Sequence, residues 1–352
     1  MSLAASVPRA AIVAVLAAVG CARSHDLGVG TTTAGSGGAG TTSAATTGSG
    51  GAPTTAGAGG APVEPSGPTA LTVVNGLNDY SAARFCFLPG DAPWPAAAAG
   101  LPFAAGQAVD LATALPPGVD VTPWVIAGDL SATAGKTCSE MLALAQPGDG
   151  GTTPSVLAAP LGVIPQAVLA SDRSLLLVPI GCMGGAGHDD PSQANGCGAT
   201  YTVQTPTVSA VLLAMSRIPD PDHISLQVVS ASVVIPTSDV RVKPGLATAL
   251  EADVAPSLSP GGIGPSPPFH ELALSGYAPL GAAQIKTYPP GGFSATSVTM
   301  LSDVLGASAV GTSGFATGAS LVLVAVGAAP GAPAGPFWHK LTYAVVQADP
   351  GP

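Results

Sequence analysis

Beyond residue 70 the chain consists of short apolar runs that glycine and proline interrupt at close intervals. The 47 Gly and 36 Pro make up close to a quarter of the 352 residues. Glycine destabilises helix interiors through its backbone entropy, and proline removes a backbone donor and clashes with the preceding turn. Apolar runs of about four to eight residues between such interruptions are typical of β-strands. The sequence therefore predicts an all-β fold.

Three pairs of segments match each other in the same order along the chain. They are LTVVNGLNDYSAARFCF (71–87) with LQVVSASVVIPTSDVRV (226–242), SLLLVPIG (174–181) with SLVLVAVG (320–327), and VLLAMSRIPDP (211–221) with KLTYAVVQADP (340–350). Chance can produce any one match in a chain rich in Val and Leu, but three in one order indicate an internal repeat. We expect two tandem immunoglobulin-like antiparallel β-sandwich repeats, with repeat 1 at 71–221 and repeat 2 at 224–350.

The cysteines predict two disulfides and one modified thiol. Of the five Cys, Cys21 follows an N-terminal apolar run, and the other four lie in the folded region. An even number of cysteines in an exported protein favours disulfides, for which three connectivities exist. We favour Cys86–Cys138 and Cys182–Cys197 and expect no metal, because the chain lacks a C-x-x-C pair.

The second disulfide would close a loop that is specific to repeat 1. The offset between the repeats falls from 146 to 129 residues across the interval that contains Cys182 and Cys197. The loop sequence MGGAGHDDPSQANG is rich in turn-forming residues, which indicates a surface insertion between two strands. Insertions on a repeated scaffold are good functional candidates. The segment CSEMLALAQ (138–146) predicts a short surface helix that begins at the first disulfide.

The N-terminus predicts export and lipidation. Arg9 precedes an apolar run over 10–20, which is shorter than the roughly 20 residues of a membrane span and fits a signal peptide. The sequence Ala18-Val19-Gly20-Cys21 resembles a bacterial lipobox, so we expect residues 1–20 to be a signal peptide and Cys21 to be acylated with palmitate-type chains. The alternative is an ordinary secretory signal that leaves Cys21 free.

A tether separates this expected anchor from the folded region. Residues 28–62 are Gly, Ala, Thr, Ser and Pro with one Val, so we expect a disordered tether over 21–70. Ala22 lacks the Asp that retains bacterial lipoproteins in the inner membrane. We therefore expect the protein in the bacterial cell envelope, anchored to the outer membrane.

Two segments resemble a known family. The opening block V-V-N-x-L-x-D-x-x-A-A-R-F-C-F and the strand SLLLVPIG resemble a family of bacterial cell-envelope β-sandwich domains of unknown function. Many members are lipoproteins, and many hold two tandem copies. The resemblance implies the fold and the envelope location but no catalytic residues. Asp239 of repeat 2 keeps the strand Asp of the family, whereas Arg84 takes its place in repeat 1.

Charge bears on the function classes that remain. The net charge of −10 disfavours nucleic-acid binding, and the 9% of charged residues leaves little material for acid/base catalysis. We predict a non-catalytic, lipid-anchored envelope protein that acts as a binding or structural module without a cofactor. Its expected partners are the membrane and a glycan or envelope protein. The alternatives are an extracellular carbohydrate-binding or adhesion protein that uses the repeat 1 loop, and a hydrolase whose site is assembled from distant residues.

Few side chains are candidates for ligand binding. The repeat 1 loop contributes His188, Asp189 and Asp190, and an exposed Trp94 could add a stacking surface. The alternative interpretation gives the Asp residues Asx-turns and gives Trp94, Trp124 and Trp338 places in the core. A second polar cluster, Asp220-Pro-Asp-His223, lies between the repeats and is open to the same alternative.

Overall fold

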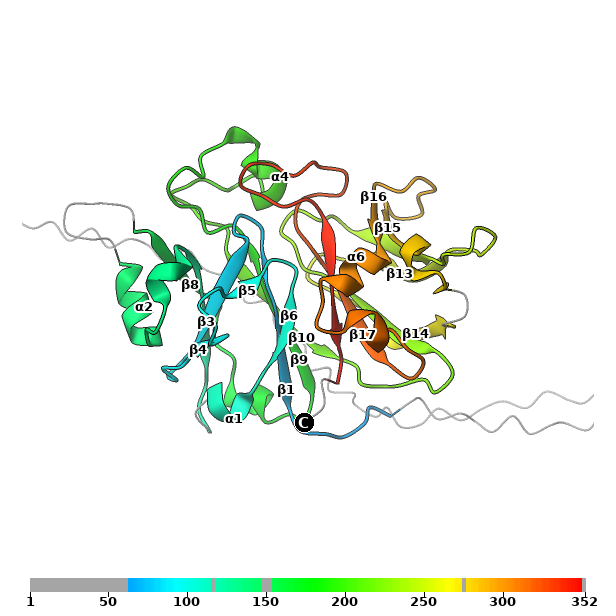
Figure 1. Cartoon of the computed structure of the whole chain (residues 1–352), viewed down its shortest axis with the longest axis horizontal. Coiled ribbons are helices and arrows are strands. Elements are labelled where there is room, and N and C mark those ends of the chain that lie inside the picture. The colour runs from blue at the N-terminus through cyan, green and yellow to red at the C-terminus, as the bar shows by residue number, and fades with distance from the viewer. Residues whose placement is uncertain (1–62, 115–117, 147–153, 274–276, 350–352) are drawn as a thin grey trace, which may run out of the picture. The chain divides into compact units, whose positions relative to one another are not determined.

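Four β-sheets stack face to face in the computed structural model, which describes residues 63–114, 118–146, 154–273 and 277–349 (Figure 1). Each of the two sandwiches consists of two sheets. We call the two sheets that face the other sandwich the inner sheets, and the two remaining sheets the outer sheets. The expected signal peptide, Cys21 and the tether up to residue 62 lie outside the described residues.

The strands of the first sandwich form two sheets. The outer sheet has the order β4 (Pro93–Trp94), β3 (Ala82–Leu88), β7 (Thr122–Gly128) and β8 (Val156–Pro160), with β5 (Leu101–Pro102) also on β3. The inner sheet has the order β10 (Ser209–Met215), β9 (Ser174–Gly181), β1 (Ala70–Val74) and β6 (Gly106–Val109), with β2 (Gly76–Leu77) also on β9.

The strands of the second sandwich follow the same plan. Its inner sheet has the order β14 (Ile263–Leu272), β11 (Ile224–Ser230), β17 (Ser320–Val326) and β18 (Thr342–Gln347). Its outer sheet has the order β13 (Ala252–Leu258), β12 (Ser238–Lys243), β15 (Gln284–Tyr288) and β16 (Ser297–Met300). The all-β sandwich prediction is confirmed, and the sheets are mainly antiparallel.

Each inner sheet also contains one parallel pairing. The strand SLLLVPIG is β9 and runs parallel to β1, whereas SLVLVAVG contains β17 and runs parallel to β11. The matched segments therefore occupy corresponding places in their sheets. This agreement supports the tandem repeat, which remains a prediction.

Three apolar layers separate the four sheets. One fills the first sandwich around Phe85, and another fills the second sandwich around Leu226. The third, which we call the seam, lies between the two inner sheets and contains Val74, Leu176 and Val324. Because the seam covers their second face, all eight residues of β9 are buried. This explains why SLLLVPIG is continuously apolar rather than alternating.

A helical insertion covers the outer sheet of the first sandwich. Helix α2 (Cys138–Leu144) begins at the Cys86–Cys138 disulfide, which confirms both the predicted helix and the predicted pairing. Arg84 is buried beneath the insertion, where its guanidinium donates to the Thr133 carbonyl at 2.9 Å. Arg84 therefore holds this insertion against the outer sheet.

The other helical segments are short. They are α1 (Leu111–Ala114), η1 (Leu130–Thr133), α3 (Gln166–Leu169), η2 (Pro191–Gln193), α4 (Ala194–Cys197), η3 (Leu280–Ala282), α6 (Leu301–Gly306) and α7 (Gly311–Gly314). Within the described ranges, no helix has the length and apolar character to cross a bilayer.

Candidate functional site

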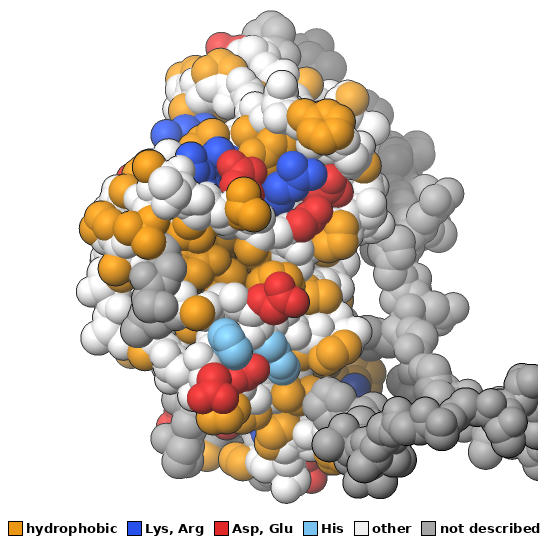
Figure 2. All heavy atoms as spheres, turned by 90° about the vertical axis from the view of Figure 1, so that its right-hand side faces the viewer, with side chains coloured by type: hydrophobic (Ala, Val, Ile, Leu, Met, Phe, Trp, Pro, Cys, Tyr) orange, Lys and Arg blue, Asp and Glu red, His pale blue; other side chains and the backbone are white. Residues whose placement is uncertain are grey.

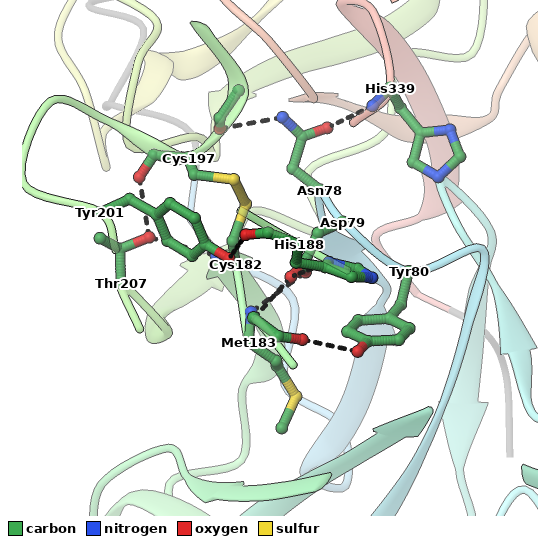
Figure 3. A network of polar contacts seen from close by, with 12 residues as sticks. Asn78, Asp79, Tyr80, Cys182, Met183, His188, Cys197, Tyr201, Thr207 and His339 are labelled. Atoms are coloured by element: carbon green, nitrogen blue, oxygen red, sulfur yellow. Dashed lines mark hydrogen bonds and ion pairs between the residues drawn. A yellow bond between two sulfur atoms is a disulfide. The ribbon is translucent and has the colours of Figure 1, made fainter. Parts of the chain in front are cut away.

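The candidate site is the disulfide loop, residues 182–197, between β9 and β10. The predicted Cys182–Cys197 bond closes it, and both cysteines are buried (Figure 3). The loop was expected to be a surface excursion, but Met183 and His188 are also buried. It folds back onto the first sandwich because the turn between β2 and β3 supplies polar side chains that bind its backbone.

Three consecutive residues of that turn hold the disulfide loop. Asn78 donates from its side-chain amide to the carbonyl of Gly196 at 2.9 Å. The carboxylate of Asp79 accepts from the backbone N–H groups of Met183 and Gly184, at 3.1 and 2.7 Å. The Tyr80 hydroxyl donates to the carbonyl of Gly184 at 2.6 Å.

Asp79 and His188 form the polar centre of the site. The side chain of Asp79 is fully buried, and its Oδ2 lies 3.3 Å from Nδ1 of His188. The imidazole is stacked on Tyr80 with a centroid distance of 4.9 Å and contacts Phe337 of the second sandwich at 4.6 Å. A buried carboxylate needs such partners, because desolvation penalises an unpaired charge heavily.

The tyrosine hydroxyls around the disulfide loop remain protonated donors. Burial, reinforced by the charge of Asp79, raises the pKa of Tyr80 and raises the pKa of Tyr201 to about 12. Tyr201 donates to the carbonyl of His188 at 2.9 Å (Figure 3). Both hydroxyls therefore donate to the loop over the whole physiological pH range.

The disulfide loop also contacts the connection between β17 and β18 in the second sandwich. The backbone N–H of His339 donates to the side-chain oxygen of Asn78 at 3.0 Å, and Ala329 donates to the carbonyl of Asn195 at 3.2 Å. Gly196 lies so close to Trp338 that a Cβ at position 196 would stand 2.6 Å from Cβ of Trp338. The loop thus fastens the two sandwiches to each other at one end of the seam.

The Asp79–His188 pair has the residue types of an acid/base pair, but its contacts hold the disulfide loop in place. A general base needs access to a substrate proton. His188 is 7% exposed and lies between two aromatic rings, and the neighbouring hydroxyls donate to loop carbonyls. Burial also lowers the pKa of His339, which keeps that second imidazole neutral. The arrangement fixes the position of the loop.

The predicted ligand-binding residues do not gather in one place. His188 is engaged as described, and Asp189 is exposed. Asp190 caps η2 by accepting from the backbone N–H of Ser192 at 2.8 Å, and hydrogen bonds from Ser192 lower the pKa of Asp190. Trp94 lies on β4, where its ring is 5.8 Å from Phe85, and Figure 1 shows β4 well away from α4.

The remaining candidates follow the core and turn interpretations. Trp338 is buried, and its indole N–H donates to the carbonyl of Pro333 at 3.0 Å, whereas Trp124 packs beside the first disulfide. Asp220 accepts from the backbone N–H groups of Asp222 and His223, which is an Asx-turn. In the part of the chain that the structure describes, no group of His, Cys, Asp and Glu is placed to hold a metal.

The outer sheet of the second sandwich carries a separate charged cluster, visible as adjacent red and blue side chains in Figure 2. Arg241 stacks over the ring of Tyr288 at 4.3 Å and pairs with Asp253 at 3.7 Å. Burial opposes the ionisation of Glu251, but hydrogen bonds from Lys286 and Tyr288 outweigh it and lower the pKa of Glu251.

Sequence reasoning missed the residues that hold the loop. Asp79 belongs to the opening block on which the family resemblance rests, yet nothing in the sequence paired it with backbone groups about a hundred residues further along. The available signal was a run of three polar or aromatic residues, Asn78 to Tyr80, directly after a buried strand.

The comparisons with known proteins add no relative. No protein-family model matches the chain, and no curated protein matches it in sequence. The fold and the site together define an all-β protein of two sandwiches with two disulfides. The resemblance to the envelope β-sandwich family remains a prediction.

Proposed function

We propose that the protein is a non-catalytic, lipid-anchored module of the bacterial cell envelope that holds the disulfide loop away from its anchor. The observation that carries this proposal is the arrangement of the two ends of the described chain. Both lie at Arg217, whereas the disulfide loop lies at the opposite end of the inner sheet (Figure 1).

Arg217 connects the start and the end of the folded region. Its guanidinium donates to the carbonyl of Pro68 and lies 4.0 Å from the carboxylate of Asp349. The same guanidinium donates to Ser174, the first residue of β9, at 2.7 Å. A tether that precedes residue 63 would therefore join the sandwiches near the start of β9.

The length of strand β9 gives the distance from the tether junction to the disulfide loop. It runs for eight residues from Ser174 and is followed directly by Cys182. At about 3.3 Å per residue, the disulfide loop stands about 25 Å beyond the tether junction. With an anchor at Cys21, the end of the sandwiches that carries the disulfide loop would be free to face away from the membrane.

The polar side chains in and beside the disulfide loop make contacts within the fold, which supports a structural role for the loop rather than catalysis. Asp79 accepts two backbone N–H groups of the loop, the His188 ring packs between Tyr80 and Phe337, and Asp190 caps a short helix. The alternative function, carbohydrate binding or adhesion through this loop, has less support for the same reason.

Membrane fractionation of the full-length chain in a Gram-negative host tests the proposal. Cys21→Ala should move the protein from the membrane to the soluble fraction, because the acyl chains supply the membrane affinity. Ala22→Asp should retain the anchor and shift the protein from the outer to the inner membrane. A Cys21→Ala chain that still sediments with membranes would disprove the lipid anchor.

A further inference from the structure

Residues 63–69, which precede β1, lie against the link between the two sandwiches, and we call this segment the strap. The carboxylate of Glu64 accepts hydrogen bonds from the backbone N–H of Arg217 and from the hydroxyl of Ser216, the latter at 2.8 Å. The carbonyl of Pro68 accepts from the guanidinium of Arg217. The strap is therefore bound to both the backbone and the side chain of Arg217.

The strap covers the guanidinium of Arg217. This side chain is 3% exposed, and its Nε donates on the other side to the hydroxyl of Ser174 at 2.7 Å. Gly67 passes so close that a Cβ at position 67 would stand 2.5 Å from Nη1 of Arg217. The absence of a side chain at position 67 therefore allows the strap to lie on the guanidinium, and loss of the strap would expose this charge to water.

The strap is held more weakly than the strand that follows it. Residues 63–66 and Pro68 are exposed, and a cavity of about 300 Å³ lies beside Pro65, between the strap and Pro219. Residues 71–74 of β1 are all buried, and β1 pairs with β9 on one side and with β6 on the other. Segments with few buried apolar contacts open before the core does.

A pull on the tether acts on the strap before it acts on β1. The described chain enters at residue 63 and reaches β1 only at Ala70, so tension from a membrane anchor passes through the strap first. While the contacts of Glu64 and Pro68 hold, β1 carries no load. Water competes for each hydrogen bond of an exposed segment, so these contacts break at a lower force than the pairing of β1.

We propose that the strap is a tension-sensitive switch: a pull on the tether releases residues 63–69 while both sandwiches stay folded, and the release exposes the guanidinium of Arg217. The inference rests on the proposed membrane anchor, which puts the tether under tension. Seven released residues add at most about 24 Å of chain between the anchor and the sandwiches. The surface at the tether junction gains an exposed positive charge at the same time.

Single-molecule pulling on the full-length, unlipidated chain with its disulfides formed tests the proposal. One handle is attached to the thiol of Cys21, and the other to a thiol introduced by Phe293→Cys, because Phe293 is 97% exposed on the hairpin between β15 and β16. Thr296 of this hairpin lies beside the connection between β17 and β18, at the end that carries the disulfide loop. A step of at most about 24 Å should precede the unfolding of the sandwiches.

Two variants weaken the strap at different points without changing the core. Glu64→Ala removes the carboxylate that binds the backbone of Arg217, and Gly67→Ala places a methyl group against the guanidinium. In both, the short step should move to lower force or disappear, whereas the force that unfolds the sandwiches should stay unchanged. Ser66→Ala changes an exposed residue of the strap and is the matched control, which should keep the step as it is.

Chemical modification provides a readout that needs no force. Phenylglyoxal reacts with accessible guanidinium groups, and peptide mapping measures the reaction at each arginine. Arg217 should react about tenfold faster in the two strap variants than in the wild type, because its reactivity follows the population of the released strap. Buried Arg84 and exposed Arg173 are internal controls whose reactivity should not change.

The proposal would be overturned by a wild-type chain that shows no step before unfolding, or by a step that both strap variants leave unchanged. An unfolding force that falls in the strap variants, or equal reactivity of Arg217 in all the chains, would overturn it as well. None of these measurements involves a lipid. A chain that is not acylated at Cys21 would disprove the anchor and leave the strap readouts unchanged, so the two failures are distinguishable.

Discussion

Replacing Asp79 by Ala tests whether this carboxylate holds the disulfide loop on the first sandwich. The carboxylate is fully buried and accepts two backbone N–H groups of the loop, at 3.1 and 2.7 Å. Without it, both donors stay buried without a partner, at a cost of about 1–3 kcal/mol each. We therefore expect Asp79→Ala to lower the free energy of unfolding by about 2–5 kcal/mol.

Calorimetry at neutral pH under oxidising conditions measures this loss. For a folded region of this size, 1 kcal/mol corresponds to about 2 °C, so Tm should fall by about 4–10 °C. The matched control is Asp190→Ala, which removes a solvent-exposed cap of the same loop and should lower Tm much less than Asp79→Ala does. Equal shifts in the two variants would refute the assignment of Asp79 as a main contact that holds the loop.

Limited proteolysis provides an independent readout. In Asp79→Ala the loop backbone loses the carboxylate that holds Met183 and Gly184, so cleavage within 184–196 should become faster. In Asp190→Ala the contacts of Met183 and Gly184 with Asp79 remain, so the loop near these residues should stay resistant to cleavage. A loop that is cut at the same rate in the wild type and in Asp79→Ala would show that other contacts hold it.

Three further predictions follow from the disulfide, the charged cluster and the seam. Replacing both Cys86 and Cys138 by Ala removes a link across 52 residues, which should lower the free energy of unfolding by about 4 kcal/mol. Because the seam couples the two sandwiches, calorimetry should show a single transition at lower Tm rather than two transitions. Because the pKa of Glu251 is lowered on folding, its stabilising effect is present above about pH 4.5 and is lost on acidification, so the acid unfolding curve of Glu251→Gln should be less steep than that of the wild type. Gly106→Ala should cost about 1–3 kcal/mol by overlap with Val346, and the further change Val346→Ala should restore part of that loss in urea unfolding.

Local patterns in the sequence were sufficient to predict the all-β class, the strands of the matched segments, the short helix at Cys138 and both disulfides. SLLLVPIG predicted a strand, and β9 is a strand, but the structure shows in addition that all eight of its residues are buried. The sequence did not reveal what covers the second face. Val74 and Val324 read as ordinary core residues of separate sandwiches, and only the structure shows them packed together in the seam.

The candidate site was harder to predict because it depends on contacts between distant segments. His188 in a Gly-rich loop has the sequence context of an exposed ligand, but Asp79 and Phe337 enclose it from two different sandwiches.

The seam has a consequence for how such a chain can be divided. A fragment that ends at residue 221 would expose to water the apolar face of β1 and β9 that lines the seam, and a fragment that starts at 224 would expose the matching face of β11 and β17. Large exposed apolar surfaces of this kind drive association. Each fragment expressed alone should therefore form dimers or aggregates. Mixing the two fragments should restore a soluble complex, because each covers the apolar face of the other.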